Sequence, residues 1–136
     1  MACLDTSCLL DLLGRGGPEL SRRAYKAIDQ LGESEEELTT TLFSVGELYV
    51  GVHRSSKPDI ERENVEALLE GIAVLPFDER SARTFGMISA HLFSIGKPAG
   101  DLDVLIAAVA IINGHSILTR NERHFRNITD LAVITY

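Results

Sequence analysis

Several absences narrow what this chain can be. Its 136 residues include only two cysteines, Cys3 and Cys8, and no second cysteine pair or nearby histidine completes a zinc spacing. We therefore expect buried free thiols and a reducing compartment. The longest apolar run, residues 104–112, is too short to span a bilayer, and no basic region followed by an apolar stretch opens the sequence. The expected result is a cytoplasmic protein without a membrane segment.

The sequence also lacks the signatures of several enzyme classes. It has no G-x-x-x-x-G-K-[ST], G-x-G-x-x-G, G-x-S-x-G or H-E-x-x-H motif. These absences disfavour P-loop nucleotide hydrolases, dinucleotide-dependent enzymes, α/β-hydrolases and zinc proteases, whose chemistry depends on those spacings. The glycine-rich stretch 14–18 (GRGGP) follows an expected helix, so we interpret it as a turn and not as a phosphate-binding loop.

The acidic balance at first argues against a nucleic-acid ligand. The net charge is −7, whereas proteins that bind phosphate backbones are usually basic. An RNA or DNA ligand fits this charge only if acids are concentrated in a metal site while bases gather elsewhere. The bases do gather, in a group at 15–26, at Lys97, and at Arg120, Arg123 and Arg126. Arg120 and Arg123 are the best candidates for phosphate contacts.

Hydrophobic patterning alternates between the strand period and the helix period along the chain. The predicted strands cover residues 2–5, 38–42, 72–76, 116–119 and 131–135. The predicted helices cover residues 18–31, 44–53, 60–70, 78–95 and 101–113. The last helix is apolar all round from residue 104 onward, which indicates a central, buried position. Together these elements predict an α/β fold, a three-layer α/β/α sandwich with a central five-stranded parallel sheet, spanning 1–136 as one domain.

Acidic and amide side chains recur where the predicted strands end. They are Asp5 at the end of the first strand, Glu47 after the second, Asn121 after the fourth, and Asp101 and Asp103 at the start of the buried helix. Ligands of open parallel sheets bind outside the carboxyl ends of the strands, so we expect these groups to share one crevice. Carboxylates crowded in a partly buried crevice repel each other unless a cation lies between them. Mg²⁺ or Mn²⁺, which prefer oxygen ligands, are suitable cations for such a site.

Each of these positions also has a structural role open to it. Asp5 and Asn121 can cap a helix or a short turn, and the acids at 101 and 103 can complement the helix dipole. Residues 44–47 (SVGE) have the pattern of a capping box, which gives Glu47 a structural role at a helix that starts at residue 44. Taken singly, each structural role is the better supported one. Their coincidence at one edge of the sheet is what favours a metal site.

Four short motifs, in order and in spacing, resemble those of PIN domains, and the last is similar to the end of VapC toxins from toxin–antitoxin pairs. The motifs are Asp5-Thr6-Ser7, Ser44-x-x-Glu47-Leu48, Asp103-x-Leu-Ile-Ala-Ala108 and Thr119-Arg-Asn121-x-x-x-Phe125. The resemblance covers nearly the whole chain. It implies a five-stranded parallel sheet between helices and metal-dependent endoribonuclease activity with Mg²⁺ or Mn²⁺. It also implies a homodimer, and a small antitoxin that silences the enzyme from the same groove.

Carried over position by position, the resemblance makes Asp5, Glu47 and Asp103 the acidic metal ligands. Asn121 matches the fourth catalytic position, and Asp101 is an additional acid that some relatives share, which we interpret as a secondary metal ligand. His124 departs from the family pattern, in which an acid before the phenylalanine is common. The candidate RNA contacts are Lys97, Arg120, Arg123, Thr6 and Thr119. For the two threonines, local backbone hydrogen bonding is an equally good interpretation.

Two other functions fit parts of the sequence. A receiver-like phosphoacceptor domain is also acidic and binds Mg²⁺, but it requires a second acid after the first strand, where this chain has Thr6. A non-catalytic PIN-like module that binds RNA or a partner protein is the remaining alternative; the intact Asp5, Glu47 and Asp103 argue against it, and Asn121 leaves it open. Apolar residues at 48–52 and 68–69 are a further reason to expect a homodimer.

Overall fold

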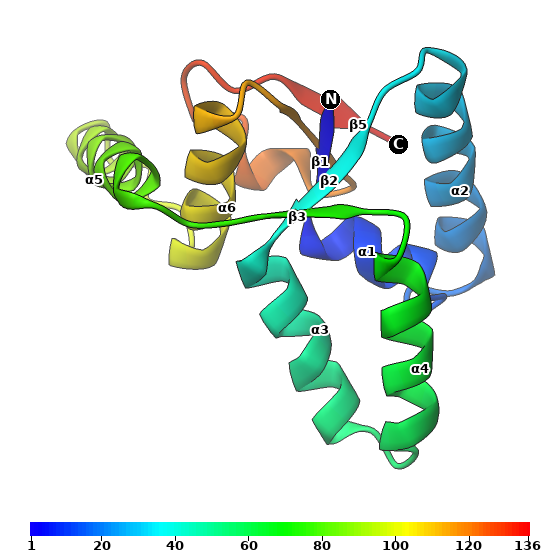
Figure 1. The fold of residues 1–136 in the computed structure, drawn as a ribbon. Coiled ribbons are helices and arrows are strands. Elements are labelled where there is room, and N and C mark those ends of the chain that lie inside the picture. Colours follow the sequence, from blue (N-terminus) through cyan, green and yellow to red (C-terminus); the bar gives the residue numbers. More distant parts are fainter.

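Strands and helices alternate in the computed structural model, which describes all residues from 1 to 136 (Figure 1). The strands are β1 (Ala2–Leu4), β2 (Leu38–Thr41), β3 (Ala73–Leu75), β4 (Ser116–Thr119) and β5 (Val133–Thr135). The helices are α1 (Thr6–Leu12), α2 (Pro18–Glu33), α3 (Leu42–Arg54), α4 (Pro58–Leu69), α5 (Glu79–Ser94), α6 (Asp101–Ile112) and the 3₁₀ helix η1 (Glu122–His124).

The five strands form one parallel sheet in the order β3-β2-β1-β4-β5. The chain leaves β1 on one side to reach β2 and β3, and it returns to the other side of β1 for β4 and β5. This reversal is a topological switch point, the place where open α/β sheets bind their ligands. The predicted parallel five-stranded sheet is confirmed, and its switch point lies where β1 and β4 end.

Two hydrophobic clusters cover the two faces of the sheet. Cys3 of β1 and Ile117 of β4 belong to the cluster that includes α5 and α6. The next residue of each strand, Leu4 and Leu118, belongs to the cluster that includes α1, α2, α3 and α4. Successive strand residues point to opposite faces, so the helices lie in separate layers on either side of the sheet (Figure 1). The three-layer α/β/α sandwich is confirmed, and α6 is buried as its sequence predicts.

The predicted start at residue 44 of the helix over 44–53, with a capping box over 44–47, is wrong. Helix α3 begins at Leu42, because Thr41 has an extended backbone and its hydroxyl accepts a hydrogen bond from the Ser44 N–H at 3.2 Å. Thr41 is therefore the N-cap, and Glu47 lies in the second turn. This leaves the Glu47 carboxylate without a capping role.

The predicted apolar surface at 48–52 and 68–69 is only partly present, because Val50 alone is exposed there and residues 68 and 69 are half-buried. Leu48 and Val52 are only 2% and 0% exposed and belong to the core beneath α3. Besides Leu42 at the start of α3, the large exposed apolar side chains of this region are Val50 and Ile60. They lie on the outer sides of α3 and α4, since residues two apart on a helix point in nearly opposite directions. None of the helices combines the length and apolar character needed to cross a membrane.

Candidate active site

Asp5 is held firmly where β1 ends. Its Oδ1 accepts hydrogen bonds from the Cys8 N–H at 2.9 Å and from the Ser7 hydroxyl at 2.7 Å, and its Oδ2 accepts one from the Thr119 hydroxyl at 2.5 Å. The first bond makes Asp5 the N-cap of α1. Only 4% of Asp5 is exposed, and this burial raises the pKa of its carboxyl despite the three donors. The negative charge of Asp103 raises that pKa further.

Glu47 reaches the same end of the sheet from α3. Its Oε2 accepts a hydrogen bond from the Thr6 hydroxyl in the first turn of α1. Thr6 Oγ1 also lies 3.2 Å from the hydroxyl of the buried Ser44. The motif Ser44-x-x-Glu47 thus places both side chains one turn apart on one side of α3, facing the start of α1.

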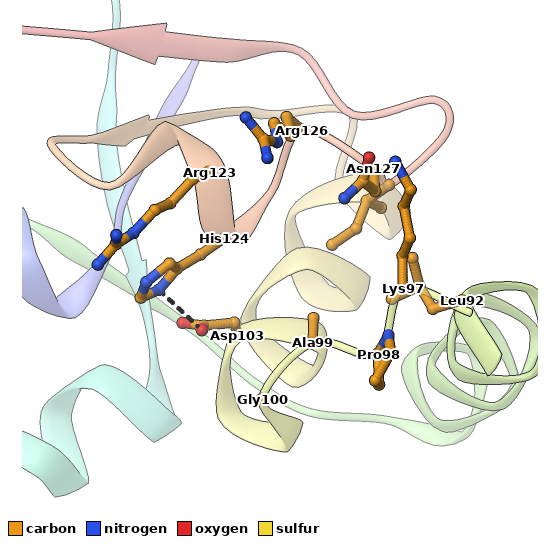
Figure 2. Close-up of a pocket in the computed structure, with 11 residues that line it drawn as sticks. Leu92, Lys97, Pro98, Ala99, Gly100, Asp103, Arg123, His124, Arg126 and Asn127 are labelled. Atoms are coloured by element: carbon orange, nitrogen blue, oxygen red, sulfur yellow. Dashed lines mark ion pairs between the residues drawn. The ribbon is translucent and has the colours of Figure 1, made fainter. Parts of the chain in front are cut away.

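Asp103 approaches from α6, in the opposite layer. Its Oδ2 lies 3.0 Å from Nδ1 of His124 in η1, as Figure 2 shows by a dashed line. Both side chains are partly exposed, at 29% for Asp103 and 38% for His124. His124 therefore occupies the position where an acidic residue is common in PIN domains, and here it contacts the carboxylate of Asp103. The sequence marked the departure at His124 but gave no sign of this contact.

The carboxylates suit a hard divalent cation in their chemistry. Asp5 and Asp103 act on one another electrostatically, and a cation between them would offset both the burial of Asp5 and the like charge. As the side chains stand, no three His, Cys, Asp or Glu residues lie close enough to hold one ion. Glu47 is turned to Thr6 and Asp103 to His124. To bind one ion together, Glu47 and Asp103 would have to turn from these partners or present their other carboxylate oxygens.

Two other predicted site residues lie in different surroundings. Asp101 is exposed and lines a small crevice with Ser89 and Phe93 of α5, and it does not line the neighbouring cavity to which Asp103 belongs. The reason is helical phase, since two residues along a helix correspond to a rotation of about 200°. The structure thus does not bring Asp101 to Asp5. Asn121 follows β4 directly, and its N–H donates to Thr119 Oγ1 at 2.9 Å, beside the hydrogen bond from Thr119 to Asp5.

Arg120 belongs to a partly buried network centred on Asp11. Its Nε donates to Oδ2 of Asp11 at 2.8 Å, and the same oxygen accepts a hydrogen bond from the Tyr136 hydroxyl at 2.7 Å. Asp11 is fully buried, and its Oδ1 has no hydrogen-bond partner. The turn 14–18 closes over this carboxylate, and Gly16 fits there because a Cβ would lie 2.4 Å from Asp11 Oδ1. The interpretation of GRGGP as a turn agrees with the positive φ of Gly14 and Gly17.

Lys97 and Arg123 line one cavity of about 430 Å³ next to Asp103 (Figure 2). Neither side chain forms a salt bridge, in contrast to Arg120. Arg126 and Asn127 line the same cavity. Sequence reasoning noticed Arg126 only as part of a basic run and did not consider Asn127. No local pattern marks that residue, because its position depends on how the segment after η1 folds back toward the loop that follows α5.

Comparison with known proteins identifies the family to which the chain belongs. The family model described as PIN domain matches residues 2–131. The Ribonuclease VapC of Rickettsia bellii is 31% identical over 136 residues, covering 97% of this chain and 93% of that protein. Among solved structures, the DNA-bound VapBC of Salmonella typhimurium matches with a TM-score of 0.86 at 25% identity, covering 98% of this chain and 96% of that one.

A second solved structure extends the comparison. VapBC-5 of Mycobacterium tuberculosis, a member of the VapBC family of toxin-antitoxin systems, matches with a TM-score of 0.69 at 25% identity and covers 99% of this chain and 98% of that one. The family model, the relative from Rickettsia bellii and the shared fold all indicate the same family. The chain belongs to the PIN domain family, among its VapC ribonucleases.

Proposed function

We propose that this chain is the ribonuclease toxin of a toxin–antitoxin pair, and that it hydrolyses RNA phosphodiester bonds with Mg²⁺ or Mn²⁺ held by Asp5, Glu47 and Asp103. The VapC relative and the VapBC structures support the activity and the partner class. The observation that carries the proposal in this chain is Asp5, a buried carboxylate at the switch point whose pKa is raised by burial and by Asp103. Such an arrangement is unfavourable without a cation and favourable with one.

The residues around the carboxylates have distinct tasks in this mechanism. The Thr119 and Ser7 hydroxyls and the Cys8 N–H orient both oxygens of Asp5. Asp5, Glu47 and Asp103 would hold a divalent ion, which would lower the pKa of a water for attack on phosphorus and neutralise charge on the phosphoryl oxygens. The backbone N–H of Asn121 donates to the same Thr119 hydroxyl. We assign the side-chain amide of Asn121 to a contact with the substrate phosphate or with the attacking water.

The predicted RNA contacts divide into two groups. Lys97 and Arg123 form no salt bridge and line a cavity beside Asp103, so we propose that they bind phosphate oxygens. The hydroxyls of Thr6 and Thr119 are bound to Glu47 and Asp5, so we propose that they position those carboxylates. The Arg120 side chain is 32% exposed and its Nε is bound to Asp11. A contact between Arg120 and RNA would use its remaining guanidinium N–H groups.

Metal binding by Asp103 is tested without measuring activity. Mn²⁺ binds the folded state preferentially, so at about 100 times its Kd it should stabilise the unmutated protein by about 2.7 kcal/mol and raise its Tm. We expect Asp103→Asn to lose most of that rise. In EDTA the same variant should differ from the unmutated protein by about 1 kcal/mol or less, because the Asp103–His124 pair is partly exposed.

Asp101→Asn is the matched control for this measurement. It makes the same change of charge two residues away on α6, but Asp101 lies on the α5 side. The control should keep the full Mn²⁺-dependent rise in Tm. Equal rises for the unmutated protein and Asp103→Asn would remove Asp103 from the metal site.

An antitoxin partner should place a basic side chain over the carboxylates. The same unbalanced negative charge that favours a cation at Asp5 and Asp103 favours an arginine or lysine from a partner chain. We expect the purified complex to cleave RNA far more slowly than the free chain, and added Mn²⁺ to restore activity only in part. A complex that retains full activity would show that the partner leaves this site open.

A non-catalytic PIN-like module remains a second candidate, because no three acids stand ready around one point. It predicts RNA binding without any cleavage in Mn²⁺. The homodimer and the cytoplasmic location stay predictions. Sedimentation at micromolar concentration and cell fractionation test them, and a strictly monomeric chain would contradict the first.

A further inference from the structure

A cavity of about 430 Å³ opens between the loop that follows α5, the start of α6 and the segment that follows η1. Helix α5 ends at Ser94 and the chain turns at Gly96, which has a positive φ of 68°. This turn directs Lys97 to the cavity, whose lining it shares with Asn127 (Figure 2). Asp103 lies at one end of the cavity, so the cavity adjoins the proposed metal site.

The charge of this cavity is opposite to that of the molecule as a whole. The chain has a net charge of −7, yet Lys97, Arg123 and Arg126 line the cavity and none of them forms a salt bridge. The one carboxylate in the lining, Asp103, is bound to His124. Three cations without salt bridges outnumber this single carboxylate, so the cavity attracts an anion.

The rest of the lining suits a base. Leu92, Ala99 and Ile128 supply apolar surface, and the side chain of Asn127 forms no hydrogen bond within the protein. A free amide offers a donor and an acceptor side by side, which is the pattern that pairs with base edges. The volume lies in the range of small-ligand sites, and it accommodates one nucleotide.

We propose that this cavity binds one unstacked RNA nucleotide next to the phosphate that is cleaved, with Lys97 and Arg126 on its phosphate and Asn127 on its base edge. The proposal rests on the ribonuclease function proposed above and names the subsite that selects the substrate. Because a base must leave its stack to enter, the enzyme cuts single-stranded segments. Asn127 is then a specificity-determining residue.

The phosphate contact is tested with the double variant Lys97→Ala/Arg126→Ala. The readouts are KM for a short single-stranded oligoribonucleotide of mixed sequence and the dependence of its binding on salt. Loss of two phosphate contacts should raise KM by about tenfold or more. It should also make the slope of log K against log salt shallower by about 0.7, the value for one neutralised phosphate on a single strand.

Arg54→Ala/Lys57→Ala is the matched control. It also removes two exposed cations, but from the end of α3 and the turn before α4, and neither residue lines the cavity. Binding is measured in an Asp5→Asn background, so that the result does not depend on cleavage. If the Lys97/Arg126 variant matches the control in KM and in salt slope, the cavity does not bind the phosphate, even where cleavage by the unmutated chain is normal.

Two further outcomes separate this proposal from the proposed function. The unmutated chain could cut no RNA and yet differ from the Lys97/Arg126 variant in salt slope as predicted. That result would support the nucleotide site and contradict the ribonuclease function. A Lys97/Arg126 variant that binds RNA normally but no longer binds the antitoxin would overturn the nucleotide proposal and assign the cavity to the partner.

The base contact is tested separately with Asn127→Ala. Cleavage products from a pool of random single-stranded RNA are sequenced for both proteins. We expect the base preference beside the cut to change or disappear in the variant, while the Mn²⁺-dependent rise in Tm stays. An unchanged base preference would show that Asn127 does not read the base.

Discussion

Asp5→Asn should slow RNA cleavage by about a thousandfold or more while the chain stays folded, because the ligand that positions the ion contributes several kcal/mol to the transition state. Folding should survive because asparagine is also an accepted N-cap. Its Oδ1 can keep the hydrogen bond from the Cys8 N–H at the start of α1. Cleavage assays in Mn²⁺ and circular dichroism measure the two expectations together.

The same variant has a stability signature. Burial and the charge of Asp103 raise the pKa of Asp5 in the folded state above its ordinary value of 3.8. A raised folded pKa means that the contribution of Asp5 to stability is complete below its unfolded pKa and is lost as the pH rises through the folded pKa. In EDTA at neutral pH, Asp5→Asn should therefore be at least as stable as the unmutated chain, and the difference should narrow as the pH falls toward 4. If Asp5→Asn is inactive and also unfolded, its loss of activity does not support a catalytic role for Asp5.

Arg120→Met should destabilise the fold by about 3 kcal/mol, the second large effect we expect. Asp11 is fully buried, and one of its oxygens already has no hydrogen-bond partner. Loss of the Arg120 bond at 2.8 Å leaves the buried carboxylate with the Tyr136 hydroxyl alone. An uncompensated buried charge is costly, whereas methionine retains the packing of the arginine stem. Urea denaturation of both proteins measures the difference in unfolding free energy.

Arg123→Met is the control for this effect, since Arg123 is exposed and forms no ion pair. Its unfolding free energy should change by about 0.5 kcal/mol or less. Adding Asp11→Asn to Arg120→Met removes the buried charge and should recover part of the loss. If Arg120→Met costs no more than Arg123→Met, the network does not stabilise the fold and Arg120 is free to contact RNA.

The fold followed from hydrophobic periodicity, because strands and helices bury their apolar residues with different periods. The all-apolar helix after Asp103 predicted the buried α6, and the short strand runs predicted a sheet covered on both faces. Element ends were less predictable. The start of α3 was missed because Thr41 and Ser44 are both suitable caps, and only the extended backbone of Thr41 decides between them.

The candidate site was predictable in so far as it follows from strand order. Asp5, Thr119 and Asn121 meet because β1 and β4 are neighbours at the switch point. Contacts that depend on packing were not predictable. The pairing of His124 with Asp103 joins η1 to α6, and the burial of Asp11 beneath Arg120 joins α1 to the end of β4. Neither pair lies within a local sequence pattern, so the sequence alone could not show it.

The most direct test of the central claim is cleavage of total RNA by the purified chain under three conditions, with products mapped by sequencing. The conditions are Mn²⁺ alone, excess EDTA, and EDTA followed by an excess of Mn²⁺. Metal-dependent hydrolysis at Asp5, Glu47 and Asp103 predicts cleavage in the first, none in the second and recovery in the third, with the same cut sites in the first and third. Full cleavage in EDTA would contradict the account, because it would show that these carboxylates act without the ion for which their arrangement is proposed.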